Sequence, residues 1–101
     1  MKSFEVSLDT MVATSKYITQ EGMPILQVDH HYDPEGGDDW EFHCGNDDYA
    51  MKNMQLVRLN IILQIDPDII NVSDLPSGYV AVRKSSVDKW EYLKSELRFI
   101  S

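Results

Sequence analysis

A five-residue stretch of strict alternation, Trp40-Glu41-Phe42-His43-Cys44, constrains the fold more than any other part of the chain. Successive side chains of a β-strand point to opposite faces of the sheet. Trp40, Phe42 and Cys44 therefore share one face, whereas Glu41 and His43 share the other. Burying each large apolar side chain contributes about 1.5–3 kcal/mol or more. We therefore predict that this strand seeds the core.

A turn precedes this strand and makes it the second strand of a predicted hairpin. Residues 33–37 read Asp-Pro-Glu-Gly-Gly, in which the proline fixes φ and the glycines accept positive φ. A loosely alternating segment, residues 25–32, lies on the other side of the turn. Residues 25–44 therefore predict an antiparallel hairpin with a longer loop.

The remaining segments predict further short elements. We expect strands over residues 4–8, 55–59 and 79–83, a second short apolar run over 11–13, and a helical turn or loop over 15–21. We also expect helical segments over 49–53, 61–65 and 66–70, and turns at 22 and 76–78. Tyr49 and Met51 are expected to face inward, and Asn60 to cap the helix that follows it. Residues 86–98 combine helical spacing with alternation, and we expect a strand over 89–93 before an irregular or helical end.

These elements predict one small α+β domain over residues 1–101, with a mostly antiparallel sheet and short helices. The single cysteine, Cys44, cannot form an intramolecular disulfide, which fits a reducing compartment. No apolar segment of a signal peptide follows Lys2, and no apolar run approaches the length of a membrane span. We therefore expect a soluble cytoplasmic protein.

Acidic residues are concentrated in one part of the chain. The formal net charge is -8, and residues 17–51 contain nine acidic residues but no Lys or Arg. The other residues hold eight acidic and nine basic side chains and are near neutral. An acidic surface repels nucleic acid and anionic lipid and steers a basic protein toward itself. The alternative interpretation is a solvated face that keeps the protein soluble.

Four side chains, His30, His31, His43 and Cys44, are the metal-type cluster of the sequence. Neighbours in a strand point to opposite faces, so at most half of this cluster can converge, and the spacings C-x-x-C and H-x-x-x-H are absent. We expect no bound metal and no cofactor, although the sequence leaves zinc binding open. His43 is badly placed to act as a base for Cys44, and the motifs G-x-S-x-G and a Gly-rich phosphate loop are absent. We therefore expect a protein that is not an enzyme.

Three pieces of the chain share their order and spacing with a known family. They are residues 15–25 (SKYITQEGMPI), residues 39–48 (DWEFHCGNDD), and the series LNII, DPDII and LPSG within residues 59–78. Over about residues 11–92 the chain resembles the bacterial immunity protein 33-like family, a domain of unknown function. Its members usually carry a small residue and glycine before the tryptophan, where this chain has Asp38-Asp39. The core positions match better than the polar ones.

The resemblance implies a small α+β bacterial protein that neutralises a co-encoded toxin, and it supplies no catalytic residues. An acidic surface agrees with this role, because it can occlude the basic cleft of a nuclease after electrostatically steered association. We predict a partner contact made of carboxylates with aromatic or imidazole anchors. The carboxylates are Asp33, Glu35, Asp38, Asp39, Asp47 and Asp48, and the anchors are Tyr32, Tyr49 or His31.

Two other hypotheses stay open from the sequence. The first is a stand-alone structural or regulatory domain that forms a homodimer through an exposed sheet edge and uses its acidity for solubility. The second is a small metal-dependent enzyme, which requires His30 or His31 to bind zinc together with His43.

Overall fold

Ten short elements build the fold in a computed structural model, which describes residues 2–95 apart from the side chain of Asp33. In chain order they are β1 (Met11–Ser15), α1 (Lys16–Thr19), β2 (Gln27–Asp33), β3 (Gly37–His43), η1 (Met51–Asn53), β4 (Met54–Arg58), α2 (Leu59–Ile65), η2 (Pro67–Val72), β5 (Tyr79–Val82) and β6 (Glu91–Lys94). The two η elements are 3₁₀ helices. Residues 96–98 of the predicted C-terminal end lie outside the described residues.

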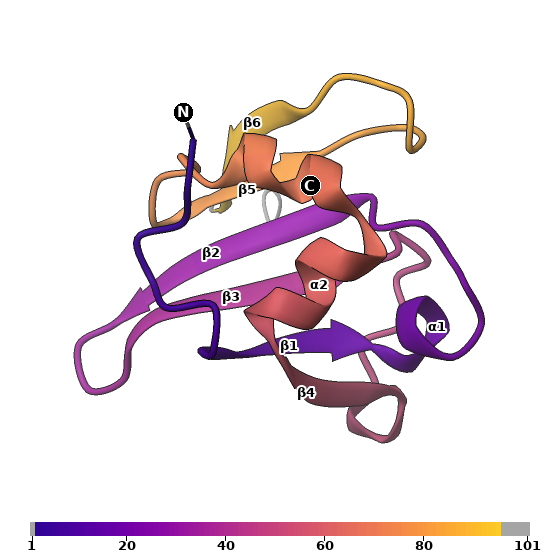
Figure 1. The fold of residues 1–101 in the computed structure, drawn as a ribbon, viewed down its shortest axis with the longest axis horizontal. Helices are drawn as coiled ribbons and strands as arrows, with labels where there is room; N and C mark the ends of the chain where they lie inside the picture. The colour runs from indigo at the N-terminus through magenta and orange to yellow at the C-terminus, as the bar shows by residue number, and fades with distance from the viewer. Residues whose placement is uncertain (1, 96–101) are drawn as a thin grey trace.

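The strands form one six-stranded sheet in the order β4-β1-β3-β2-β5-β6. The pair of β1 with β3 is parallel, and the other four pairs are antiparallel. Figure 1 shows α2 and the helical segment after it on the viewer's side of this sheet, together with the N-terminal segment. The predicted α+β class with a mostly antiparallel sheet is therefore confirmed.

The β2–β3 hairpin forms because its loop residues fit the turn. Pro34 begins the three-residue loop, and Gly37 adopts φ +80°, a conformation that favours glycine. Asp33 and Gly37 close the loop as Cα partners, and the register continues without a break to Gln27 opposite His43. The predicted hairpin is confirmed, and its loop end extends beyond the neighbouring strands in Figure 1.

The register gives the sheet two chemically different faces, because directly opposite residues point to the same side. The core face carries Val28 opposite Phe42 and His30 opposite Trp40. The other face, which we call the polar face, carries the alternate side chains of the hairpin: Gln27, Asp29, His31, Asp39, Glu41 and His43. The expected separation of His30 from His31 onto opposite faces is therefore confirmed.

The core lies between the core face and the layer formed by α2, η2 and the N-terminal segment. Trp40 is 3% exposed, and Phe42 is fully buried. The Trp40 ring lies 4.9 Å from the Phe4 ring in an edge contact and 3.9 Å from the His30 ring in a stack. The cluster also contains Cys44, Ala81 and a set of leucine, isoleucine and valine side chains: Val12, Ile18, Ile25, Val28, Leu59, Ile62, Ile69, Val72 and Leu75. The alternating strand does seed the core, as predicted.

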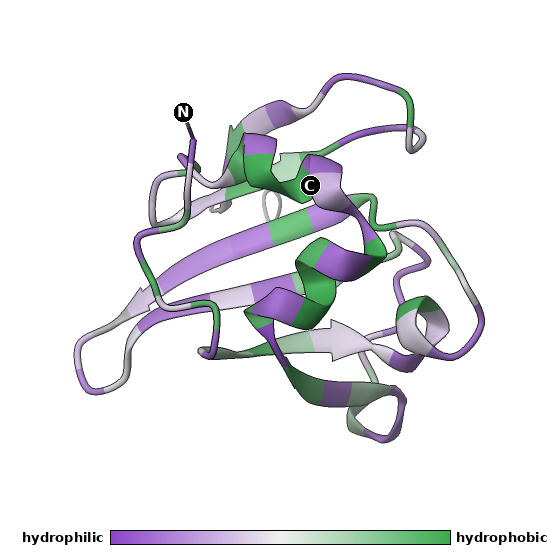
Figure 2. Ribbon diagram, in the orientation of Figure 1, coloured by the Kyte–Doolittle hydropathy of each residue, from purple (hydrophilic) through white to green (hydrophobic). Residues whose placement is uncertain are grey.

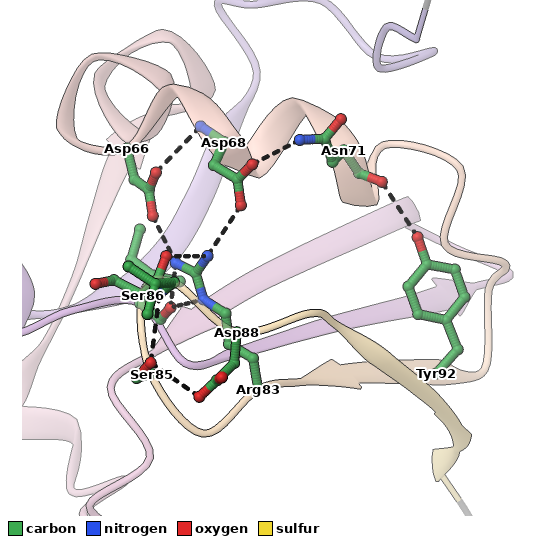
Figure 3. A network of polar contacts seen from close by, with 10 residues as sticks. Asp66, Asp68, Asn71, Arg83, Ser85, Ser86, Asp88 and Tyr92 are labelled. Carbon is green, nitrogen blue, oxygen red and sulfur yellow. Dashed lines mark hydrogen bonds and ion pairs between the residues drawn. The ribbon is translucent and has the colours of Figure 1, made fainter.

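A buried arginine holds the helical layer to the sheet (Figure 3). Arg83 Nη2 lies 2.6 Å from Asp66 Oδ2, and its Nη1 lies 3.0 Å from Asp68 Oδ2. Both Nε and Nη2 donate to the carbonyl of Ile25, just before β2, and Cζ lies 4.2 Å from the centroid of the Trp90 ring. One guanidinium thus joins the start of η2, the approach to β2 and the loop before β6.

Three local predictions are wrong. Residues 4–8 form no strand, because Phe4 packs against Trp40 while the backbone of this segment bends and turns instead of pairing with the sheet. Asn60 does not cap α2, which begins at Leu59 and has no side-chain cap. Met51 is 86% exposed and Tyr49 is 42% exposed, so neither enters the core.

Among the described residues, no helix is long and apolar enough to cross a bilayer.

Candidate functional site

The predicted contact residues fall into two groups at opposite ends of β3. Tyr32, Glu35 and residues 38–39 lie at the loop end of the hairpin, whereas residues 47–49 follow the other end of the strand. Six residue steps along β3 correspond to about 20 Å. The side chain of Asp33 lies outside the described part of the structure.

A cavity of about 310 Å³ opens beside the loop end of the hairpin, and we call it the hairpin-end pocket. Glu5 lines it from the N-terminal segment, His30, Asp38 and Trp40 line it from the hairpin, and residues 73–77 line it from the loop after η2. The pocket is therefore bounded by carboxylates, with an aromatic pair at its hairpin wall. A cavity of this size holds a single long side chain of a partner.

His30 links the pocket wall to the loop after η2. Its Nδ1 lies 2.6 Å from the carbonyl oxygen of Leu75, and its Nε2 lies 2.9 Å from Asp38 Oδ1. The His30 ring also stacks on Trp40. This arrangement fixes Asp38 at the mouth of the pocket.

The loop after η2 adds two polar groups to the same pocket. Ser73 is 7% exposed, and its Oγ has no hydrogen-bond partner within the described part of the chain. Asp74 accepts a hydrogen bond from the Tyr92 hydroxyl at 2.6 Å and lies 3.3 Å from Lys2 Nζ. The Tyr92 hydrogen bond is the main cause that lowers the pKa of Asp74, so this carboxylate stays ionised.

Charge around the pocket is predominantly negative. Asp38 supplies a carboxylate from the hairpin. Glu5 and Asp74 add two carboxylates from outside the hairpin, and Lys2 Nζ lies 3.3 Å from Asp74 Oδ2. Tyr32, which is 63% exposed, is the cross-strand partner of Asp38. The loop end thus combines acidity, an exposed aromatic ring and a cavity.

The second group of predicted residues makes local structural contacts. Asp48 accepts hydrogen bonds from the Tyr17 hydroxyl at 2.6 Å and from Asn53 Nδ2 at 2.8 Å. Tyr49 donates to Gln27 Oε1 at 3.2 Å, and its ring meets the His43 ring edge-on. These contacts hold the loop after β3 against α1 and the polar face.

Replacing Tyr17 with phenylalanine will raise the pKa of Asp48 toward its ordinary value of about 3.9. The hydrogen bond from Tyr17 is the first cause that lowers this pKa. A lowered carboxyl pKa contributes stability that is present above the unfolded-state value and is lost as pH falls through the folded-state value. The free energy of unfolding of the variant will therefore depend less on pH in acid. Carboxyl NMR titration of both proteins measures this, and identical Asp48 titration curves would contradict it.

A second polar constellation lies on the polar face. One candidate ligand atom from each of Asp29, Glu41 and His43 lies within 4.8 Å of the other two. Asp29 and His43 are buried, and Glu41 is half-buried. His43 Nε2 lies 3.1 Å from Glu41 Oε1, and this hydrogen bond is the main cause that lowers the pKa of Glu41, against the opposing effect of burial.

Sequence reasoning missed Asp29 and Glu41 as partners of His43. It paired His43 with other histidines, but His30 lies on the core face, and His31 lies opposite Asp39, two polar-face positions farther along the hairpin. The available signal was the short loop, because closing the hairpin at residues 33 and 37 places residue 29 opposite residue 41.

Comparison with family models, curated proteins and solved structures found no match to this chain.

Proposed function

We propose that the protein is a non-enzymatic binding protein that neutralises a basic protein partner by occlusion. In this proposal the loop end of the β2–β3 hairpin enters a basic cleft of the partner. The family resemblance in the sequence suggests that the partner is a bacterial toxin domain and that binding takes place in the cytoplasm. The single buried thiol, Cys44, fits such a reducing compartment.

One observation supports this function above the others: the projecting end of the hairpin carries an exposed aromatic ring beside an acidic pocket. Tyr32 and Asp38 are directly opposite on adjacent strands, and Asp38 lines the cavity. Exposed tyrosines are typical anchors of protein interfaces. Carboxylates around such an anchor attract a basic surface from a distance and exclude acidic ones. In Figure 2 the hairpin half of β2 has the purple of hydrophilic residues.

The hairpin-end pocket supplies a place for one basic anchor of the partner. An arginine or lysine side chain that enters it would meet Glu5 and Asp38 at the rim and the stacked His30–Trp40 wall. Ser73 Oγ, which has no partner among the described residues, would accept a hydrogen bond from the same side chain. This assigns the recognition of charge to the pocket and the apolar anchoring to Tyr32.

The variant Glu5→Gln/Asp38→Asn tests this function in the cell that encodes the protein. Tagged wild-type protein is expected to capture a basic protein, identified by mass spectrometry, and the variant is expected to recover at least about tenfold less of it, equivalent to about 1.4 kcal/mol. The matched control Asp9→Asn/Glu21→Gln removes two exposed carboxylates elsewhere and should capture the wild-type amount. Asp47→Asn tests the second group of predicted residues. Equal recovery by the hairpin variant and the control would contradict the proposal.

The exposed edge of β4 favours a second candidate, a structural or regulatory homodimer. Leu56 on this edge strand is 66% exposed, and Met11 beside it is 52% exposed. Figure 2 shows green, hydrophobic bands on β4 between purple ones, and uncovered apolar edge strands tend to pair with another chain. Light scattering separates the candidates: a dimer that Leu56→Lys dissociates would support this one, and a monomer would exclude it.

A further inference from the structure

We propose that Asp29, Glu41 and His43 bind one divalent transition-metal ion on the polar face of the sheet. A carboxylate oxygen of each acidic residue and a ring nitrogen of the histidine lie within 4.8 Å of one another. Metal–ligand bonds of about 2.0–2.2 Å place tetrahedral ligands about 3.4 Å apart. Rotation of the side chains is therefore enough to close this set around an ion.

The two carboxylates occupy positions where a cation is stabilising. Asp29 and Glu41 are Cα partners on the adjacent strands β2 and β3, and like charges directly opposite each other destabilise a sheet. Asp29 is only 8% exposed, and the nearest imidazole to it besides His43 is that of His31, whose Nε2 lies 3.7 Å from Oδ2. An ion held between the two carboxylates converts the repulsion into attraction.

His43 places one ring nitrogen next to the carboxylates. Its side chain is 4% exposed, and Nε2 lies 3.1 Å from Glu41 Oε1. The other ring nitrogen, Nδ1, has no hydrogen-bond partner among the described residues. The ring itself is held in place by Glu41 on one side and by the edge contact with Tyr49 on the other.

Neighbouring polar groups orient the proposed ligands. Tyr49 Oη donates to Gln27 Oε1 at 3.2 Å, and Gln27 Nε2 donates to Asp29 Oδ1 at 3.0 Å. Such outer hydrogen bonds fix the ligand atoms of known metal sites. A cavity of about 350 Å³, lined by Glu41, His43 and Tyr49 and by apolar side chains of η1 and β4, leaves room for water on the ion.

The ligand set selects the class of ion. Imidazole suits zinc, copper, iron and nickel, whereas calcium and magnesium prefer oxygen ligands. Zn²⁺ is the clearest probe because it has no redox chemistry. The site lies on the opposite face of the hairpin from Asp38. A negative result for metal binding therefore leaves the proposed partner surface unaffected.

Titration calorimetry of the chelator-treated full chain with Zn²⁺ tests the site. We expect one ion per chain, a raised melting temperature, and no heat with Ca²⁺ at the same concentrations. Glu41→Gln and His43→Gln should each weaken Zn²⁺ binding at least about tenfold, since even an outer-shell loss costs about 10–100-fold. Asp39→Asn, a carboxylate of the same strand and face, is the matched control and should bind as the wild type does.

A measurement on the wild type keeps the proposal testable if a variant fails to fold. Zn²⁺ should shift the side-chain NMR resonances of His43 and leave those of His30 unchanged. Absence of Zn²⁺ binding, equal binding by His43→Gln and the wild type, or shifts at His30 instead would overturn the proposal.

Discussion

Replacing Arg83 with alanine will destabilise the fold by about 3–5 kcal/mol, the usual cost of removing one partner of a buried ion pair. The guanidinium is fully buried, and Asp66, at 23% side-chain exposure, loses its ion-pair partner when the arginine is replaced. The carbonyl of Ile25 loses both of its side-chain donors at the same time. Natural domains have only about 5–15 kcal/mol of stability, so this variant will be marginal or unfolded.

Urea unfolding followed by tryptophan fluorescence measures this effect. Arg58→Ala is the matched control, because Arg58 is exposed on β4, and its free energy of unfolding should change by no more than about 0.5 kcal/mol. Arg83→Lys should rescue only part of the loss, since an ammonium cannot reproduce the planar fork that reaches Asp66 and Asp68 together. An Arg83→Ala protein as stable as the control would contradict this account of the fold.

Replacing Phe42 with alanine will destabilise the protein by about 3–5 kcal/mol, because it removes a fully buried ring from a central strand and leaves a cavity. The Phe42 ring lies 6.4 Å from the Trp40 ring in a stacked arrangement, and both rings are buried. Its backbone carbonyl also accepts a hydrogen bond from Thr14 Oγ1, which ties β3 to β1.

Tyr32→Ala supplies the comparison for Phe42→Ala. Tyr32 belongs to the same hairpin but is 63% exposed, so its truncation should cost about 0.5 kcal/mol or less. The proposed function requires the opposite order for partner binding, because Tyr32 is an anchor of the contact. Calorimetric unfolding of both variants decides the stability order. Equal melting temperatures for the Phe42→Ala and Tyr32→Ala proteins would be inconsistent with a core seeded by β3.

Local pattern was enough to predict the hairpin and the core. The alternation of Trp40, Phe42 and Cys44 assigned their burial, and the loop chemistry of Pro34 and Gly37 placed the turn. These are short-range signals, because side-chain period and turn geometry depend on neighbouring residues. The α+β class followed from them.

Long-range contacts were beyond the sequence pattern. Nothing local to Arg83 indicates that its guanidinium meets Asp66 and Ile25, since the 58-residue separation of Arg83 from Ile25 is bridged only in the folded sheet. Residues 4–8 show the opposite error, in which a local pattern was trusted too far. Their alternation predicted a strand, but the segment does not join the sheet, and the Phe4 ring packs on Trp40. The pairing of Asp29 with Glu41 lay between these cases, since it needed only the register of a correctly predicted hairpin.

An NMR titration with a capped peptide, Gly-Gly-Arg-Gly-Gly, tests the acidic loop end most directly. We expect the peptide to bind with a dissociation constant of about 1 mM, which corresponds to a binding free energy of about -4 kcal/mol. The amide shifts should be concentrated at Val6, Asp38 and Ser77 around the hairpin-end pocket, and the matching glutamate peptide should cause none. Shifts confined to the polar face, or no difference between the two peptides, would contradict the assignment of this end of the hairpin to a basic partner.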